Sequence, residues 1–213
     1  MKPCGPAGQS ADRPPVCFGG SVAFHTSDGW SRDRSLLYDS NMKIYVITDT
    51  HFGHANMVKY HNRPQQFDRV LVENWNAFVA KGDVVFHLGD VAFGRNIELP
   101  RLMKKLNGRT ILCLGNHDRQ KPEWYLENGF AFACTYYVFK GVCFSHKPIT
   151  PLPPGCTLNV HGHFHSDNHR DREYADDDYF HRHRERYRLV QIEDTLAPVA
   201  LDDLLGVTSA AAA

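Results

Sequence analysis

The feature that most constrains the fold of this chain is a repeated pattern, in which a short apolar run ends abruptly in Asp, His or Asn. Short runs rich in β-branched residues are typical of buried strands. Three such runs occur, each followed directly by polar side chains: 44–48 before Asp49 and His51, 84–88 before Asp90, and 110–114 before Asn116 and His117. Any one of these motifs alone is compatible with a surface turn. The three together are informative because each stands directly after a predicted strand.

Helical patterns separate the three runs. An apolar stripe with i, i+3 and i+4 spacing begins after Asp68, which we expect to cap the helix, and it closes at Gly82. Shorter helices are expected at 56–60 and 98–106. The order strand, helix, strand, helix, strand predicts parallel βαβ units with right-handed crossovers. In such sheets ligands bind at the carboxyl ends of the strands, so the polar residues are expected to meet there.

The second half of the chain predicts further strands, some of which end in histidine. We expect strands at 132–139, 142–145, 157–160 and 187–192, and a short helix within 198–205. His146 follows the second of these strands, and His163 and His165 follow the third. The segment 166–186 is dense in Asp, Arg and His without an apolar period, which predicts a solvated loop.

Two pairs of polar residues are spaced two apart, namely Asp49 with His51 and His163 with His165. In an extended chain such residues point the same way, so each pair is expected to project together from its strand. A carboxylate and an imidazole aimed at one point can ligate a metal ion.

Composition limits the domain number and the partners. A chain of 213 residues with 42% hydrophobic residues suits one sizeable globular domain with tails. The 24 basic residues balance the 24 acidic ones, which disfavours a general grip on nucleic acid but leaves a local basic groove open. No apolar run approaches the roughly 18 residues of a membrane span, so no membrane partner is expected.

The location is expected to be cytoplasmic. No apolar signal segment is visible at the N-terminus, and the six cysteines form no CxxC pair. Free, buried thiols in a reducing compartment are the simplest account of these cysteines.

Residues 1–41 differ from the rest of the chain. They are rich in Pro, Gly and Ser and have no sustained period, which predicts a disordered or non-native extension. Translation that starts at Met42, directly before the first strand, is one explanation. We therefore expect a domain at 42–206, with 207–213 as a tail.

Taken together, the polar motifs resemble those of the calcineurin-like metallophosphoesterases. Five motifs occur in the order of that family: Asp49-x-His51, Gly89-Asp90, Gly115-Asn116-His117-Asp118, His146 and Gly162-His163-x-His165. The resemblance covers about 42–206 and is nearest to small single-domain bacterial and phage members. This chain shares with them the pairs Arg63-Pro64 and Trp75-Asn76.

The resemblance implies an α/β fold, a four-layer α/β/β/α sandwich, with a site for two divalent metal ions. It assigns seven ligands: Asp49, His51 and His165 to one metal, Asn116, His146 and His163 to the other, and Asp90 to both as a bridge. Manganese is the preferred expectation, with iron, nickel, cobalt and zinc as alternatives, because nitrogen and oxygen donors without a thiolate suit these ions.

The implied activity is hydrolysis of a phosphomonoester or phosphodiester, through attack by a metal-bound hydroxide. A nucleotide-like small molecule is the expected substrate. By resemblance, His117 contacts the phosphate and assists the leaving oxygen, and Asp118 orients it. His54 and Arg63 are candidates for contact with the substrate phosphate, although a structural role is equally compatible with their positions.

Other functions were weighed against this one. A nuclease or a protein phosphatase would use the same site, although the neutral charge and the lack of an appended domain weigh against both. A non-catalytic scaffold on the same fold is disfavoured, because all seven expected ligands and His117 are present. The preference for monoesters or diesters and the oligomeric state are left open.

Overall fold

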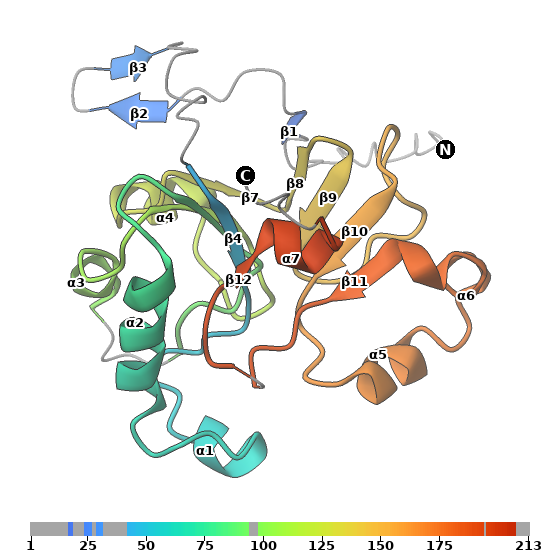
Figure 1. Cartoon of the computed structure of the whole chain (residues 1–213), viewed down its shortest axis with the longest axis horizontal. Helices are drawn as coiled ribbons and strands as arrows, with labels where there is room; N and C mark the ends of the chain where they lie inside the picture. The colour runs from blue at the N-terminus through green and yellow to red at the C-terminus, as the bar shows by residue number, and fades with distance from the viewer. Residues whose placement is uncertain are drawn as a thin grey trace, which may run out of the picture.

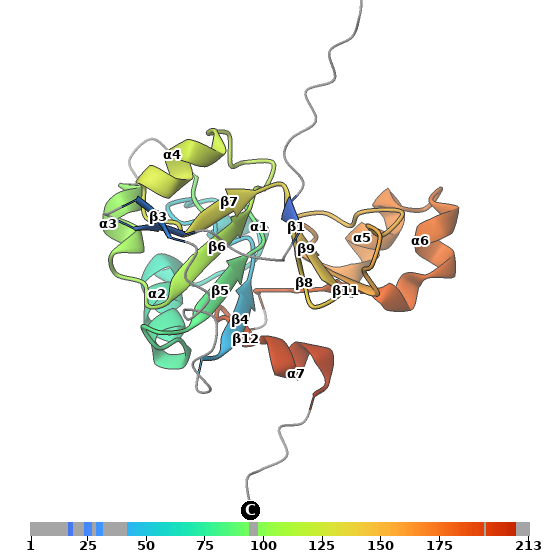
Figure 2. The same cartoon turned by 90° about the horizontal axis from the view of Figure 1, so that it is seen from above.

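Two five-stranded sheets lie face to face, with helices on both outer sides (Figures 1 and 2). The structure is a computed structural model. It describes residues 42–93, 98–193 and 195–207, and the backbone of 17–18, 24–26 and 29–31. The predicted four-layer sandwich of helices, sheet, sheet and helices is confirmed.

The first sheet is built mainly from parallel strands, as the alternation of strands and helices predicts. Its strands are, in spatial order, β12 (Val199–Ala200), β4 (Ile44–Ile47), β5 (Val84–His87), β6 (Arg109–Cys113) and β7 (Phe132–Cys134). Strands β4 to β7 run parallel, and β12 pairs antiparallel with β4. The polar residues after β4, β5 and β6 therefore leave the sheet at one edge.

The second sheet contributes another three parallel strands. Its order is β1 (Cys17–Phe18), β8 (Tyr136–Phe139), β9 (Val142–Ser145), β10 (Leu158–His161) and β11 (Tyr187–Leu189). Strands β9, β10 and β11 are parallel, whereas β8 is antiparallel to β9. A separate hairpin pairs β2 (Phe24–Thr26) with β3 (Gly29–Ser31).

Helices cover the outer faces of both sheets. The outer face of the first sheet carries α2 (Phe67–Phe78), α3 (Leu99–Met103) and α4 (Pro122–Glu127) (Figures 1 and 2). Helix α1 (Met57–Tyr60) lies near the edge of this sheet that carries the polar residues. The second sheet is followed by α5 (Asp167–Glu173), α6 (Asp178–Arg182) and a 3-10 turn (Arg184–Arg186). Helix α7 (Leu201–Leu205) packs beside β4 and β12.

The alternation of side chains along each strand creates two apolar cores. Tyr45 and Ile47 of β4 face the helices, where Trp75 of α2 is fully buried, whereas Val46 faces the second sheet. Trp75 also donates its indole N–H to the Asn107 carbonyl at 2.8 Å. Because both faces of the first sheet are buried, its strands stay fixed and their polar ends have defined positions.

Several local predictions were wrong. Helix α2 begins at Phe67, and Asp68 does not cap it, because its carboxylate accepts the Gly53 N–H instead, at 3.0 and 3.1 Å. The run 132–139 is divided at Thr135 between β7 and β8, which belong to different sheets. Helix α4 was not predicted.

The segment 166–186, predicted as a solvated loop, contains α5 and α6. Side chains of Ser166 and Asp177 cap the two helices, and each helix buries one side chain, Arg170 or Phe180. The Arg170 guanidinium lies 5.5 Å from the centre of the Phe180 ring. Because each helix buries only one side chain, the segment has no apolar period, and the sequence pattern did not reveal the two helices.

Of the predicted extension 1–41, the structure describes three short strands, and β1 pairs with β8 at an edge of the second sheet. The other residues of that segment lie outside the described residues, so the extension stays a prediction. Within the described residues no helix is both long and apolar enough to cross a membrane.

Candidate metal centre

Five strands deliver their polar residues to one region of the fold. Hydrogen bonds between successive loops continue the strand pairing beyond the sheet. Asp49 N–H donates to the Gly89 carbonyl and His51 N–H to the Asp90 carbonyl, each at 3.0 Å, and Gly162 N–H donates to the His146 carbonyl at 3.0 Å. The loops after neighbouring strands are therefore held in register, so their side chains have little freedom to separate.

Glycines allow these loops to approach closely. A Cβ atom on Gly162 would overlap the Thr48 hydroxyl and lie 2.7 Å from Asp49 Oδ2, and one on Gly115 would overlap the Asp90 carboxylate. The backbone of Gly89 has a φ of +95°, which favours glycine. The glycines that open three of the five motifs, Gly89, Gly115 and Gly162, are therefore a packing requirement of the centre.

The backbone of the site is not extended, contrary to the sequence argument. Asp49, His51, Asp90 and His163 have φ values of 49°, 47°, 55° and 68°, in the left-handed region. Side chains in this conformation are uncommon and tend to occur at functional sites. The paired residues converge because left-handed turns redirect them, which a period of two does not describe.

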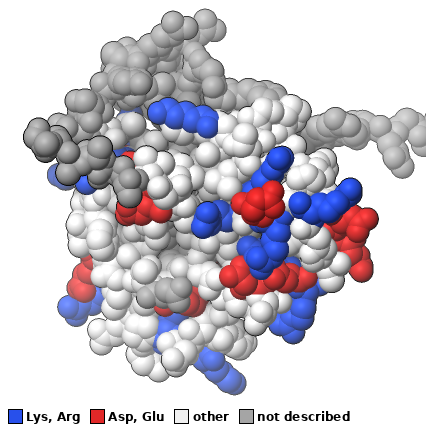
Figure 3. All heavy atoms as spheres, turned by 45° about the vertical axis from the view of Figure 1, so that its right-hand side comes forward, with Lys and Arg blue, Asp and Glu red and all other residues white. Residues whose placement is uncertain are grey.

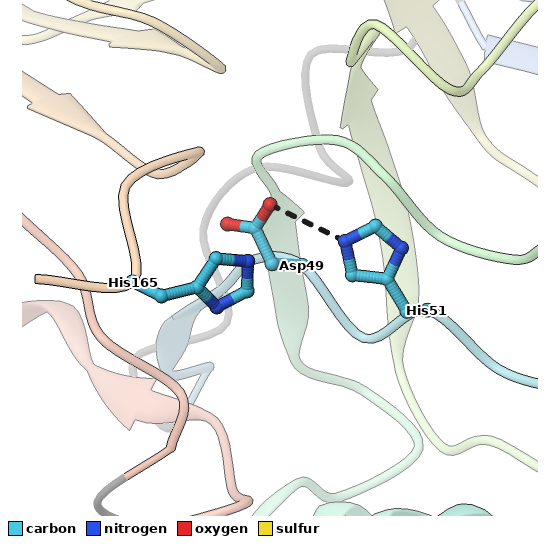
Figure 4. A group of neighbouring side chains, drawn as sticks. All are labelled: Asp49, His51 and His165. Atoms are coloured by element: carbon cyan, nitrogen blue, oxygen red, sulfur yellow. Dashed lines mark ion pairs between the residues drawn. The ribbon is translucent and has the colours of Figure 1, made fainter. Parts of the chain in front are cut away.

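Asp49, His51 and His165 form the first group of candidate ligands (Figure 4). One ligand atom from each lies within 4.8 Å of the others. The separation between Asp49 Oδ1 and His51 Nε2 is 3.9 Å. Asp49 Oδ2 accepts hydrogen bonds from the Thr48 hydroxyl and the His163 N–H, whereas Oδ1 is buried without a partner among the described residues. This carboxylate oxygen is therefore suited to coordinate a cation.

Asp90, His146 and His163 form the second group, again with ligand atoms within 4.8 Å. His146 Nδ1 donates to the Leu88 carbonyl at 2.7 Å, so its Nε2 carries a lone pair. This nitrogen faces Asn116 Oδ1 at 2.9 Å and His163 Nδ1 at 3.0 Å. A convergence of lone-pair atoms is the arrangement that a divalent cation stabilises.

The Asp90 carboxylate lies between the two groups. Its Oδ2 is 3.7 Å from His51 Nε2 and 3.5 Å from His146 Nε2, separations too long for hydrogen bonds. Its Oδ1 accepts the His117 backbone N–H at 2.8 Å. Asp90 is only 2% exposed. One buried carboxylate is thus shared by both groups.

The protonation of two candidate ligands, His51 and His163, also fits a metal. Burial, and then the charge of Arg63, lowers the pKa of His51 to about 2, and burial beside His146 lowers that of His163 to about 3. Both imidazoles are therefore neutral near pH 7, which is the form that binds metal ions.

Glu193 is a site residue that the sequence analysis missed. It accepts the Nδ1–H of His165 at 2.8 Å and a hydrogen bond from Arg63 at 2.6 Å. Although burial opposes ionisation, these partners lower the Glu193 pKa to about 2. Although burial opposes it, the Glu193 carboxylate raises the His165 pKa, and in the neutral ring the bond leaves Nε2 as the lone-pair atom. Glu193 follows a predicted strand, and that position is the signal that could have identified it.

The Arg63 side chain lies beside the candidate ligands and bonds to the backbone that carries them. Its guanidinium is buried and donates to the backbone carbonyls of Asp49 and Thr50, both at 2.8 Å, as well as to Glu193. These three bonds and the burial of the side chain support the structural role, and the contact with a substrate phosphate stays a prediction. Arg63 holds the loop that carries Asp49 and His51.

Asp118 also has a different place from the expected one. Its carboxylate accepts the N–H groups of Asp90, Val91 and Gly115, at 2.7, 3.2 and 2.8 Å. His117 Nδ1 has no hydrogen-bond partner in the described part of the chain, so the predicted contact between Asp118 and this ring is not formed. Asp118 fixes the loops after β5 and β6.

His117 and His54 lie at the mouth of the centre. The His117 side chain is 33% exposed, and its Nε2 is 3.9 Å from Asp90 Oδ2. The His54 ring packs 4.1 Å from the ring of Phe93, which in turn meets the edge of His117 at 5.2 Å. The position of His54 is compatible with substrate contact.

Two other histidines belong to the core, as expected. His87 accepts the Gly89 N–H and donates to the Thr50 hydroxyl, which itself donates to the Val91 carbonyl. Burial lowers the pKa values of His87 and His161 to about 3. Neither belongs to the groups of candidate ligands.

A substitution of Gly162 tests the close approach of the loops. Gly162→Ala should destabilise the protein by roughly 1–3 kcal/mol, because the new methyl group displaces Thr48 and Asp49. Bound manganese should fall as well. Gly82→Ala is the matched control, since nothing lies within 4 Å of its Cβ position. Urea unfolding and metal analysis decide; a wild-type result for Gly162→Ala would contradict the packing argument.

A second test concerns Glu193. Glu193→Gln removes the charge that orients His165 and balances Arg63, so manganese affinity should fall about 10- to 100-fold, as is usual when such a partner of a metal-binding histidine is lost. The control is Glu173→Gln, which alters a surface pair with Lys147. Calorimetric titration with manganese measures both. Unchanged affinity in Glu193→Gln would show that His165 is positioned by other contacts.

Comparison with known proteins agrees with this geometry. Residues 42–208 match the calcineurin-like phosphoesterase family. The chain is 36% identical over 145 residues to the uncharacterized protein MJ1445 of Methanocaldococcus jannaschii, which covers 62% of this chain and 74% of that protein. It is 39% identical over 83 residues to the Gene 66 protein of Mycobacterium phage D29, which covers 37% of this chain and 42% of the phage protein.

A solved structure is similar as well. The protein of unknown function AQ665 from Aquifex aeolicus superposes with a TM-score of 0.59 and 25% sequence identity, over 78% of this chain and 100% of that one. The family match spans nearly all the described residues, including every candidate ligand. The chain therefore belongs to the calcineurin-like phosphoesterase family.

Proposed function

We propose that this protein is a metal-dependent phosphoesterase that hydrolyses phosphate esters of nucleotide-like small molecules at a two-metal site. The observation that carries the proposal is the position of Asp90 Oδ2, 3.7 Å from the His51 nitrogen and 3.5 Å from the His146 nitrogen. Two adjacent cations repel each other, and a shared carboxylate offsets that repulsion.

The remaining donors divide between the two cations. Those of the first would be Asp49, His51 and His165, and those of the second Asn116, His146 and His163. The absence of thiolate among them favours manganese, with iron, nickel, cobalt and zinc as alternatives. Divalent cations at such a site supply Lewis acidity and make a bound water more acidic.

We infer that His117 acts on the leaving oxygen. Its ring stands at the mouth, and its backbone N–H is fixed on Asp90 Oδ1. An Nε2–H at this position can donate to a phosphoryl oxygen or give its proton to the departing alkoxide. The partial exposure of the ring lets the proton be restored from solvent.

The surface charge supports a small substrate over a long polyanion. On the face shown in Figure 3, Lys and Arg side chains lie beside Asp and Glu side chains. Ion pairs such as Lys147 with Glu173 and Arg184 with Asp171, at 2.8 and 2.7 Å, likewise bring opposite charges together at the surface. A nucleic-acid backbone is usually held by a face of one sign.

The first experiment is an activity panel on the manganese-loaded protein. It includes nitrophenyl phosphate, bis(nitrophenyl) phosphate, mononucleotides, cyclic nucleotides, short DNA and a phosphopeptide, and we expect turnover of small esters. Asp90→Asn removes the shared negative charge, so at least one metal per chain and most of the rate should be lost. If Asp90→Asn keeps two metals and a near-native rate, the bridging role is wrong. No turnover by the wild type with any of the five metals would refute the activity.

A second comparison separates His117 from the ligands. His117→Ala should keep both metals and lower kcat by roughly 10²–10⁴-fold on alkyl esters, the cost of a lost general acid. The loss should be smaller on nitrophenyl esters, whose leaving groups need little protonation. His163→Ala should instead lose metal and slow both substrates together. Equal losses in His117→Ala, or loss of metal, would make His117 a ligand or a phosphate anchor.

A further inference from the structure

A cavity of about 430 Å³ lies beside the candidate metal centre, on the side of His117. This volume is within the range of small-molecule sites. The wall includes Phe93, Leu99, Arg119, Gln120 and Trp124 as well as His117. None of these side chains except His117 has a part in the chemistry described above, so the cavity needs its own explanation.

Two aromatic side chains leave part of their surface open at this cavity. Phe93 is 38% exposed and Trp124 is 37% exposed. Each ring is nevertheless supported. Phe93 packs on His54 and meets the edge of His117, and Trp124 meets the edge of Tyr125 at 5.1 Å. Supported rings with open surface are suited to stacking on a planar ligand.

The polar wall of the cavity adds an uncompensated cation. Arg119 is exposed and has no ion pair or hydrogen-bond partner in the part of the chain that the structure describes. It follows Asp118, whose carboxylate is fixed on three backbone N–H groups, so the start of this segment has a defined position. A guanidinium here can bind a second phosphate or a carbonyl oxygen. The Gln120 amide can donate to or accept from the edge of a base.

We propose that this cavity binds the nucleobase of the leaving nucleoside of a phosphodiester. The inference rests on the proposed function and narrows its substrate class. His117 lines the cavity and is the residue that assists the leaving oxygen, so the group attached to that oxygen extends toward Phe93 and Trp124. A planar base matches their rings, whereas an aliphatic or peptide leaving group would leave the stacking surface unused.

The reaction is ordinary hydrolysis. The oxygen of a water molecule bonds to phosphorus, the bond between phosphorus and the leaving oxygen breaks, and His117 protonates that oxygen. The proton released by the water replaces the one that His117 donated. The products are a nucleoside with a free hydroxyl group and the phosphate monoester of the other alcohol. The base in the cavity is not altered and serves only to position the ester.

The test uses the manganese-loaded full chain and two dinucleotides, d(ApA) and the same compound with a tetrahydrofuran abasic residue in place of the leaving nucleoside. The leaving hydroxyl and the phosphodiester are the same in both. Stacking of one base is worth about 1–3 kcal/mol, so kcat/KM should favour d(ApA) by roughly 5- to 150-fold. Placing the abasic residue on the other nucleoside should have a smaller effect.

Trp124→Ala assigns the preference to the cavity. This variant should bring the ratio of kcat/KM between d(ApA) and the abasic dinucleotide close to one, and a ratio is insensitive to a general loss of active protein. Phe78→Ala is the matched control. Phe78 is also an exposed aromatic, 58% accessible, but it lies on α2 and does not line the cavity. Its ratio should equal that of the wild type.

The outcomes distinguish this inference from the proposed function. If the protein hydrolyses bis(nitrophenyl) phosphate but does not distinguish the dinucleotides, or if it prefers a phosphopeptide, the cavity assignment is wrong and the phosphoesterase stands. If no ester is hydrolysed, the proposed function is wrong, and calorimetry with deoxyadenosine monophosphate and deoxyribose phosphate decides on the cavity. Selective binding of the nucleotide that Trp124→Ala loses supports the inference, and equal or absent binding overturns it.

Discussion

The hydrogen bonds accepted by the Asp118 carboxylate are the interaction on which the candidate centre most depends. They bring together the N–H of Gly115 after β6 and those of Asp90 and Val91 after β5. Burial raises the pKa of this carboxyl, and the backbone N–H groups act in the opposite direction, because they stabilise the ionised form. These bonds support the left-handed conformation of Asp90, so the position of the shared carboxylate depends on a residue that is not itself a candidate ligand.

Arg63 and Glu193 give the same kind of support from the other side. They are 130 positions apart in the chain, yet their side chains form a bond of 2.6 Å beside the centre. Arg63 donates hydrogen bonds to the carbonyls of Asp49 and Thr50. Glu193 accepts a hydrogen bond from the His165 ring. The loop after β4 of the first sheet and a ligand after the second sheet are therefore connected through one ion pair, in which the Arg63 cation is buried and would be costly to leave unpaired.

The sequence predicted the parts of the fold that have a strong local pattern. Apolar, β-branched runs identified β4, β5, β6 and β9, and the polar residue after each run identified the edge where the candidate ligands meet. Local pattern failed where a distant partner decides the outcome. Asp68 looks like a helix cap, but the Gly53 N–H is its partner, and the bonds of Arg63 to Glu193 and to two carbonyls could not be predicted from its position. The helices α5 and α6 were hidden because polar residues form most of their length.

The candidate ligands divide between the two sheets, and this has a consequence for folding. Asp49 and Asp90 follow strands of the first sheet, whereas His146 and His163 follow strands of the second. Cations bound by all four residues would cross-link the two sheets, and neither sheet alone supplies the full set of ligands. Metal binding and docking of the sheets are then thermodynamically linked, so an ion at 100 times its dissociation constant adds about 2.7 kcal/mol to the free energy of unfolding. The melting temperature would thus report metal occupancy without any substrate.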